Sequence, residues 1–364
     1  MTQLDRHLAV GFIRSWLICF TSLVSLYIVI DLFNKFDDFL EVTQGQGLLE
    51  LLRATARYYG CQLTLIFDRL CGMMLLLAAI FTITWMQRNN ELTPLLAAGV
   101  PVRRVLRPIW IVALFFIAAA ALNREWIMPP LAGPLQQPPS GSRFLAVAGS
   151  YEPNGILLEG KVAHRAERLI EYFVATVPER VAGTLVVLQA REARYVPADT
   201  GPLTGGWLLT EAVPPEMAPW PTDVLTQVDT GKYFLKTQIV DFEVLTRSKG
   251  WHQFASLGEL QRELDRPGAR YLQLVAMQIH LRWTAPLIMF LTLVLGLGLI
   301  LSHRERHFLI STGVALVMAA AFYGVQLGAK YLGENEYLTP ALAAWLPILL
   351  FGPLAIVLQD AMPS

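Results

Sequence analysis

Six long apolar segments dominate this chain and decide what it can fold into. They cover about residues 13–33, 62–86, 106–124, 275–301, 308–330 and 341–359, and a membrane-spanning helix needs about 20 mostly apolar residues. Backbone polar groups inside lipid must bond to one another, which favours helices. Only 16% of the 364 residues are charged, against about 25% in soluble domains. The sequence therefore predicts an α-helical polytopic membrane protein with six transmembrane helices.

The first segment also resembles the apolar part of a signal peptide. Its apolar run is long, however, and no small-x-small cleavage site precedes Asp31, so we expect a retained span. Orientation follows from Lys and Arg in short loops, which stay in the cytoplasm. The basic residues gather in the N-terminal segment and in the loops after the second and fourth spans: Arg6, Arg14, Arg88, Arg103, Arg104, Arg107, Arg304 and Arg306. Both termini are therefore expected to be cytoplasmic.

Residues 125–272 differ from the rest and divide the chain into three parts. We expect a first transmembrane half at 1–124, an inserted extracytoplasmic β domain at 125–272 and a second transmembrane half at 273–364. The insertion opens with "MPPLAGPLQQPPSG", whose prolines exclude regular helix. The fold class is thus three spans, a β-jellyroll-like domain and three more spans, written 3+3.

Short β-type runs separated by turn residues fill the insertion. They are "GILLEGKV", "RLIEYFVATV", "TLVVLQAREARYV", "GWLLTEA" and "GKYFLKTQIVDFEVL". Such runs predict an antiparallel sandwich or an open barrel. The closing "SLGELQRELDRPG" predicts a short helix, because Ser256 and Glu259 have capping-box spacing and Pro267-Gly268 stops it.

Motifs for catalysis are weak in this sequence. Gly155, Gly160 and Lys161 have the spacing of a phosphate-binding loop, but Val162 replaces the hydroxyl that would hold Mg²⁺. We therefore expect a β-turn there and no catalytic residues. A net charge of zero gives no global field for nucleic acid.

Metal ligands and disulfides are not indicated either. His303 and His307 are four residues apart, a spacing that can bind zinc, but two arginines of the same loop would repel the cation. The three cysteines, Cys19, Cys61 and Cys71, lie in or beside apolar runs and read as small buried thiols. No metal and no cofactor are expected.

The loop "QRNNELTPLLAAGVPVRR", residues 87–104, contains a short amphipathic helix at about 90–99. We expect Asn89 or Asn90 as its N-cap and Gly99 as its end, followed by Pro101. A helix of this length is unstable alone in water, so its apolar face needs a partner. One interpretation is an interfacial helix against lipid headgroups. The other is a coupling helix that enters a groove on a cytoplasmic motor protein.

Four stretches resemble the LptF/LptG permease family of the lipopolysaccharide-export ABC transporter. They are "RNNELTPLLAAGV", the basic "LDRHLAVGFIRSWL" before the first span, "QIHLRWTAPLIMFLTLVLGLGLIL" and "LTPALAAWLPILLF". The resemblance spans both membrane halves in their order around a β insertion. It implies a subunit of the inner membrane that does not hydrolyse ATP itself.

The resemblance also implies partners and a coupling site. These partners are a second homologous permease subunit, two copies of a cytoplasmic ABC ATPase, periplasmic jellyroll bridge proteins and lipopolysaccharide or a related glycolipid. By this analogy the ATPase groove receives Glu91, Leu92, Thr93, Leu95, Ala97, Ala98 and Gly99.

An anionic glycolipid needs cations at the outer rim of an apolar cavity, as charge-assisted donors to phosphate. Lys35, Arg53, Arg57 and Arg282 are the candidates. The alternatives are ordinary snorkelling, or for Lys35 a pair with Asp37, Asp38 or Glu41.

The fifth span carries Gly313, Gly324 and Gly328, the last two in GxxxG spacing. Small residues of this kind favour close helix packing, and the family suggests a movable seam there.

Two rival functions remain. One is a membrane scaffold or signalling protein whose β domain binds an extracytoplasmic partner, and the other is a lipid-modifying membrane enzyme.

Overall fold

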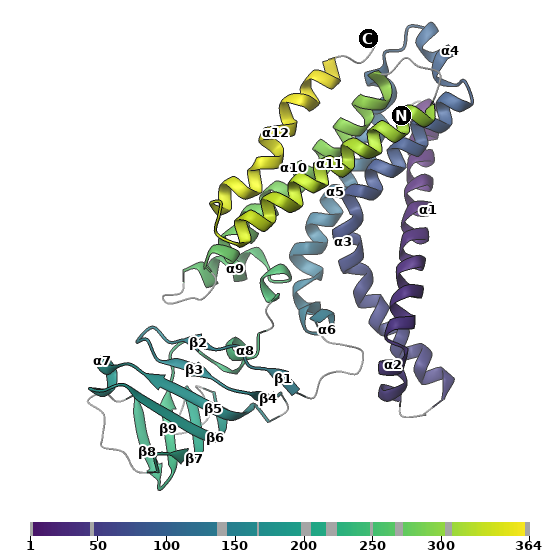
Figure 1. Ribbon diagram of the computed structural model, residues 1–364. Helices are drawn as coiled ribbons and strands as arrows, with labels where there is room; N and C mark the ends of the chain where they lie inside the picture. The colour runs from purple at the N-terminus through teal and green to yellow at the C-terminus, as the bar shows by residue number, and fades with distance from the viewer. Residues whose placement is uncertain are drawn as a thin grey trace. The chain divides into compact units, whose positions relative to one another are not determined.

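The computed structural model describes residues 3–43, 47–136, 144–165, 167–197, 205–215, 224–247, 250–265, 272–302 and 308–360 (Figure 1). The chain forms two compact units. The first, the membrane unit, comprises Met1–Leu135, Phe254–Leu260 and Gln273–Ser364. The second, the β unit, comprises Gln136–Gln253 and Gln261–Leu272.

Six helices of the described part are long and apolar enough to cross a membrane, which confirms the predicted six-span architecture. They are α1 (Gln3–Asn34), α3 (Leu48–Arg88), α5 (Val102–Leu122), α10 (Leu272–Ser302), α11 (Phe308–Glu334) and α12 (Pro340–Asp360). A π-helical turn, Asn123–Ile127, continues α5. The short helices α2 (Phe36–Thr43) and α4 (Leu92–Ala97) lie between consecutive spans, and α6 (Ala132–Gln136) follows the third span. Figure 1 shows α4 at the end of the unit where α1 begins and α12 ends.

The core of the membrane unit lies where α1, α3, α5 and α10 meet. Fully buried residues such as Phe12, Met74, Ile109 and Leu297 come from these four helices. Gly296 permits a close approach of α10 to α3, because a Cβ there would overlap the side chain of Leu76. A second cluster joins α10, α11 and α12.

Large apolar side chains cover the outer faces of these helices. On α1 and α12 exposed examples include Ile18, Phe33, Leu349 and Ile356. Soluble proteins do not expose apolar surface on this scale, whereas lipid is a matching environment. The unit is therefore an integral membrane unit.

The β unit is built on an antiparallel sheet. Its described strands are β1 (Phe144–Ala146), β2 (Ser150–Tyr151), β3 (Leu157–Glu159), β4 (Val162–His164), β5 (Leu169–Val177), β6 (Val186–Val196), β7 (Gly206–Val213), β8 (Leu225–Asp229) and β9 (Lys232–Lys236). The order is β1-β4-β5-β6-β7-β9-β8, with β3 joining β2 to β5. This arrangement confirms an inserted antiparallel β domain. The expected turn at Gly160-Lys161 lies between β3 and β4.

Alternating side chains of these strands make a separate core. Trp207 is fully buried, stacks on Phe173 with ring centroids 5.2 Å apart, and donates its Nε1–H to the carbonyl of Val240 at 3.1 Å. Buried Glu152 accepts hydrogen bonds from the backbone N–H groups of residues 238–240. A charged group is tolerated inside because these donors satisfy it.

Two predictions for the insertion are wrong in detail. The run ending in "VDFEVL" is not all strand, since Phe242–Leu245 forms the short helix α8. Asp241 caps it by accepting from the Val244 N–H at 2.8 Å. The proline-rich stretch does contain helix, a 3₁₀ turn at Pro129–Leu131 and then α6. Proline fits the first turn of a helix, where its missing N–H is not needed. Residues 137–141 of this stretch lie outside the described residues.

The predicted capping box is confirmed. Helix α9 (Leu257–Leu264) follows Ser256, whose N–H donates to the Glu259 carboxylate at 2.8 Å. The Glu259 N–H in turn donates to the Ser256 hydroxyl at 3.2 Å. The expected Pro267-Gly268 stop lies outside the described residues.

Candidate functional site

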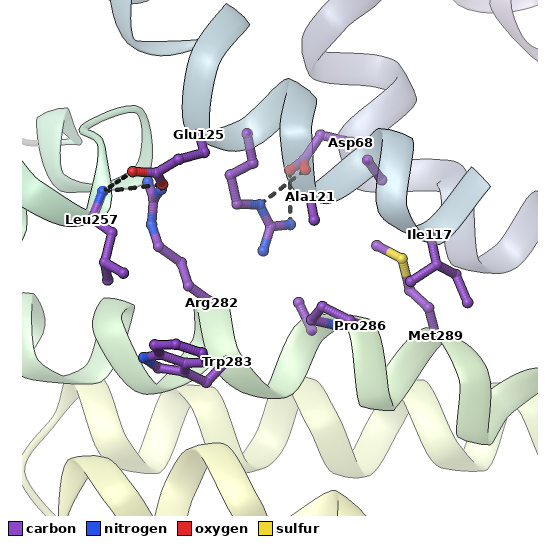
Figure 2. Close-up of a pocket in the computed structure, with 12 residues that line it drawn as sticks. Asp68, Ile117, Ala121, Glu125, Leu257, Arg282, Trp283, Pro286 and Met289 are labelled. Atoms are coloured by element: carbon purple, nitrogen blue, oxygen red, sulfur yellow. Dashed lines mark hydrogen bonds and ion pairs between the residues drawn. The ribbon is translucent and has the colours of Figure 1, made fainter. Parts of the chain in front are cut away.

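A pocket of about 320 Å³ opens between α3, α5 and α10 of the membrane unit (Figure 2). Its charged lining residues are Asp68, Arg124, Glu125 and Arg282. Asp68 lies on α3, Arg124 and Glu125 lie where α5 passes into the π-helical turn, and Arg282 lies one third of the way along α10. π-Helical turns inside longer helices are frequent at functional sites.

The first pair in this pocket joins α3 to the end of α5. Arg124 donates from Nε and Nη2 to the two carboxylate oxygens of Asp68, both at 2.9 Å. The Asp68 side chain is only 9% exposed, so the pair stands in a poorly hydrated place. Such a two-pronged contact fixes geometry as well as charge. The neighbouring Asn123 holds the same two helices by donating to the Thr64 carbonyl at 2.9 Å.

The second pair joins α5, α10 and the start of α9. The Glu125 carboxylate accepts from Arg282 Nη1 at 2.8 Å and from the Leu257 N–H at 2.8 Å. Arg282 also donates to the carbonyl of Ala255, and its side chain is 8% exposed. Figure 2 shows Glu125 and Arg282 facing each other beside Leu257. One acidic side chain thus ties two membrane helices to residues 255–257.

Apolar side chains line the rest of the pocket. They are Ile117, Ala120, Ala121, Leu257, Trp283, Ala285, Pro286 and Met289. Ile117 lies two turns before Arg124 on α5, and Met289 lies two turns after Arg282 on α10. Because the two helices run in opposite directions, their charged ends and their apolar ends coincide. The pocket is polar at one end and apolar at the other.

Lys35, the first predicted headgroup ligand, sits in a second polar cluster just after α1. Its ammonium contacts Asp31 at 2.9 Å and donates to the Tyr58 hydroxyl at 2.8 Å. Tyr59 donates to the same Asp31 carboxylate at 3.1 Å. Burial disfavours the charge on Lys35, but the hydrogen bonds to Tyr58 and Asp31 outweigh it and raise its pKa to about 12.

This pairing differs from the alternative that the sequence suggested, in which Lys35 meets Asp37, Asp38 or Glu41. The partner is Asp31, one turn earlier in the helix. Arg53 and Arg57 are exposed on the first turns of α3. The Arg282 side chain is buried and lines the pocket between α3, α5 and α10. Lipid contact by these four cations stays a prediction.

The predicted coupling helix is shorter than expected and begins differently. It is α4, Leu92–Ala97. The N-cap prediction is wrong, because both asparagines belong to the end of α3. Asn90 has φ of 55°, and its backbone N–H donates to the Gln87 carbonyl. The Glu91 N–H donates to the Met86 carbonyl. This pattern is a Schellman motif. Asparagine tolerates the left-handed conformation better than most residues.

The end of α4 is as predicted. Gly99 has φ of 79°, and the Val100 N–H donates to the Leu95 carbonyl at 3.0 Å. Leu95 and Val100 pack against the membrane core, whereas Ala97, Ala98 and Gly99 are exposed. Glu91 is half-buried, and the side chains of Leu92 and Thr93 lie outside the described part.

The three predicted packing glycines of α11 do not contact other described residues of this chain. A Cβ at Gly313, Gly324 or Gly328 would meet nothing within 4 Å, so their role as packing residues stays a prediction. Helix contact inside the chain uses Gly72, Gly296 and Gly333 instead. His303 and His307 lie outside the described residues, and within those described no three His, Cys, Asp or Glu side chains gather as a metal site.

Sequence reasoning missed Asp68, Arg124 and Glu125 as site residues. Ionisable residues within a span are costly and mark functional sites, which is a usable signal for Asp68. Its partner was hidden because Arg124 follows the apolar run and resembles an ordinary interfacial cation.

Comparison with known proteins supplies the family. No curated protein matches the chain. The family described as the lipopolysaccharide export system permease LptF/LptG matches residues 6–137 and 152–359. These ranges cover both membrane halves and most of the β insertion. The chain belongs to the LptF/LptG family of lipopolysaccharide export permeases.

Proposed function

We propose that this chain is one half of a permease that extracts lipopolysaccharide from the inner membrane and passes it to periplasmic jellyroll bridge proteins. A second, homologous permease subunit forms the other half. Two copies of a separate cytoplasmic ABC ATPase drive the transport. The family supports the permease assignment, and the exposed end of α4 is the observation that carries the coupling to an ATPase.

Extraction of such a lipid needs an outside source of energy. Each buried CH₂ of an acyl chain contributes about 0.8 kcal/mol to membrane binding. A cargo with several chains is therefore held in the membrane by tens of kcal/mol. Its extraction needs the free energy of ATP hydrolysis and a path that keeps the chains covered. A partner ATPase combined with an apolar route meets both needs.

Helix α4 is suited to transmit force because one side is fixed and the other is open. Leu95 and Val100 anchor it in the core between α3 and α5. Ala97, Ala98 and Gly99 leave an exposed surface without bulky side chains, which another protein can approach closely. In this proposal Glu91 meets a basic residue of the ATPase, and movement of α4 passes directly to the two spans that it joins.

Orientation follows from charge. The end that carries α4 also carries Arg88, Arg103 and Arg104, which favours the cytoplasm. Lys35, Arg53 and Arg57 then lie at the periplasmic end, where they receive the phosphates of the glycolipid. The β unit is inserted after α5 and before α10, so in this proposal it lies in the periplasm as well.

The second permease subunit needs a surface on this chain. Gly324 and Gly328 lie one turn apart on α11, and both are exposed with open space above them. Helices approach most closely at such positions. We assign this face, together with Gly313, to a seam with the partner through which lipid enters.

Affinity purification tests the coupling. Glu91→Lys reverses the charge beside α4, so the ATPase should fall from the purified complex to a small fraction of the wild-type amount. Glu50→Lys is the matched control, because it makes the same change on an exposed residue at the other end of α3. Equal recovery of ATPase with both variants would remove α4 as the coupling element and favour the scaffold alternative.

A further inference from the structure

We propose that the pocket between α3, α5 and α10 binds a zwitterionic phospholipid of the surrounding membrane, one acyl chain inside and its phosphate at Arg124 and Arg282. This lipid is distinct from the exported glycolipid. It serves as a structural lipid that fills the space between three spans (Figure 2).

The polarity of the pocket matches the polarity of a phospholipid. Arg124, Glu125 and Arg282 stand at one end, while Ile117 and Met289 lie seven residues deeper on their helices. Seven residues of helix rise about 10 Å. An acyl chain that lies parallel to α5 and α10 therefore runs from the charged end of the pocket past Pro286 to the apolar end. The headgroup and the chain keep the same order that they have in the bilayer.

Donors for a phosphate remain after the two ion pairs are made. Arg282 uses Nη1 for Glu125 and Nη2 for Ala255, and its buried Nε has no hydrogen-bond partner among the described residues. A buried donor without a partner is costly, which makes an acceptor at this place favourable. Arg124 binds Asp68 through Nε and Nη2, which among the described residues leaves its Nη1 for a further acceptor.

The balance of charge favours a zwitterion. Two arginines and two carboxylates line the pocket, so their formal charges cancel. An anionic lipid would add an uncompensated charge where water is scarce, which is costly. A phosphoethanolamine headgroup adds none, because its phosphate meets the guanidinium groups while its ammonium meets Asp68 or Glu125.

The size of the pocket suits a small occupant. A volume of about 320 Å³ stands at the low end of the range of ligand pockets, about 300–1,000 Å³. Part of one chain and part of a headgroup fit this space. A glycolipid with several chains does not.

Lipid analysis of the purified full-length complex tests the occupancy. Ala121→Trp fills the pocket from α5, and Ala285→Phe fills it from α10. Ala118→Trp is the matched control, since Ala118 is also an exposed alanine of α5 but does not line the pocket. After delipidation with detergent, mass spectrometry should find phosphatidylethanolamine retained by the wild type and by Ala118→Trp. Both pocket variants should lose it.

Equal retention in Ala121→Trp and Ala118→Trp would overturn the proposal. Loss of lipopolysaccharide rather than phospholipid from the pocket variants would overturn it too, since the occupant would then be the cargo. The melting temperature of each variant separates loss of lipid from loss of the fold. If Ala121→Trp melts far below the control variant Ala118→Trp, lipid retention is compared with Ala285→Phe instead.

Headgroup choice is tested in nanodiscs that contain phosphatidylethanolamine and phosphatidylglycerol in equal amounts. We expect the wild type to retain phosphatidylethanolamine roughly tenfold over phosphatidylglycerol, the value of one charge-assisted hydrogen bond. Asp68→Asn leaves one guanidinium without a compensating carboxylate and should shift retention toward phosphatidylglycerol, whereas the double variant Asp68→Asn with Arg124→Gln keeps the pocket neutral and should keep the preference for phosphatidylethanolamine. Equal retention of the two lipids by the wild type would refute the charge argument.

Discussion

One ion pair in each unit shows how different the surroundings of such a pair can be. In the β unit Arg191 and Glu211 pair with side chains that are 68% and 69% exposed. In the membrane unit Asp68 and Arg124 pair with side chains that are 9% and 23% exposed. Water screens the first pair, while the second depends on its own partners for solvation. The exposed pair in the β unit therefore contributes little to stability, whereas the buried pair in the membrane unit holds α3 to the end of α5.

The largest expected effect comes from breaking the ion pair between Asp68 and Arg124 in the membrane unit. Arg124→Ala leaves the buried Asp68 carboxylate without its partner, and the loss of one member of a buried pair costs about 3–5 kcal/mol. Thermal unfolding of the detergent-solubilised protein should show a clear drop in the midpoint for the membrane unit.

Two controls sharpen this result. Asp68→Asn with Arg124→Gln removes both charges and should recover most of the lost stability, because no buried charge is left alone. Arg191→Ala on the β unit should leave the midpoint unchanged. If Arg124→Ala behaves like Arg191→Ala, the contrast between the two units is wrong.

A smaller effect is expected inside the β unit. Trp207→Phe keeps the stacking on Phe173 but removes the Nε1–H that the buried Val240 carbonyl accepts. An unsatisfied buried acceptor costs about 1–3 kcal/mol. Limited proteolysis should show faster cleavage within 144–247, with the membrane helices protected as before. Simultaneous loss of protection in both units would show that they unfold together.

The smallest effect in stability, though a visible one in binding, concerns Lys35. Lys35→Glu should lower photocrosslinking of lipopolysaccharide near α1 several-fold, by about 1 kcal/mol of lost phosphate contact, and Lys35→Arg should retain it. Unchanged crosslinking in Lys35→Glu would refute the headgroup role.

The pH dependence of this contact has a definite sign. The pKa of Lys35 is raised from 10.5 to about 12. Its charge and the stability that this charge contributes are therefore complete below about pH 10.5 and are lost as the pH rises through about 12. Crosslinking should stay constant between about pH 6 and pH 9. A fall within that range would mean that another group titrates at the site.

The architecture could be predicted from the sequence because it depends on long runs of apolar residues. Runs of about 20 apolar residues predict spans, and the capping box of Ser256 and Glu259 is a local pattern with few other outcomes. Short elements were harder. The "DFEVL" run looked like strand by composition, and only the cap made by Asp241 turned it into α8. The composition of the run does not show that the Asp241 side chain accepts this hydrogen bond.

The candidate site was readable only in part, since its key contacts are long-range. The end of α4 at Gly99 could be predicted because its signal is local, whereas the coupling role of Glu91 and Leu95 stays a prediction. The pairing of Asp68 with Arg124, 56 residues apart, depends on how α3 and α5 pack. Likewise, Arg282 was identified as a cation near a helix end, but its partner Glu125 lies across the whole β insertion. No pattern within one segment predicts such a pair.

Release of lipopolysaccharide from proteoliposomes tests the central claim most directly. Vesicles with the co-purified complex and labelled lipopolysaccharide receive ATP or a non-hydrolysable analogue, and the label transferred to a soluble acceptor is measured. The account predicts transfer only with hydrolysis, and its loss in the Glu91→Lys variant. Transfer by this chain alone, or with the analogue, would contradict it.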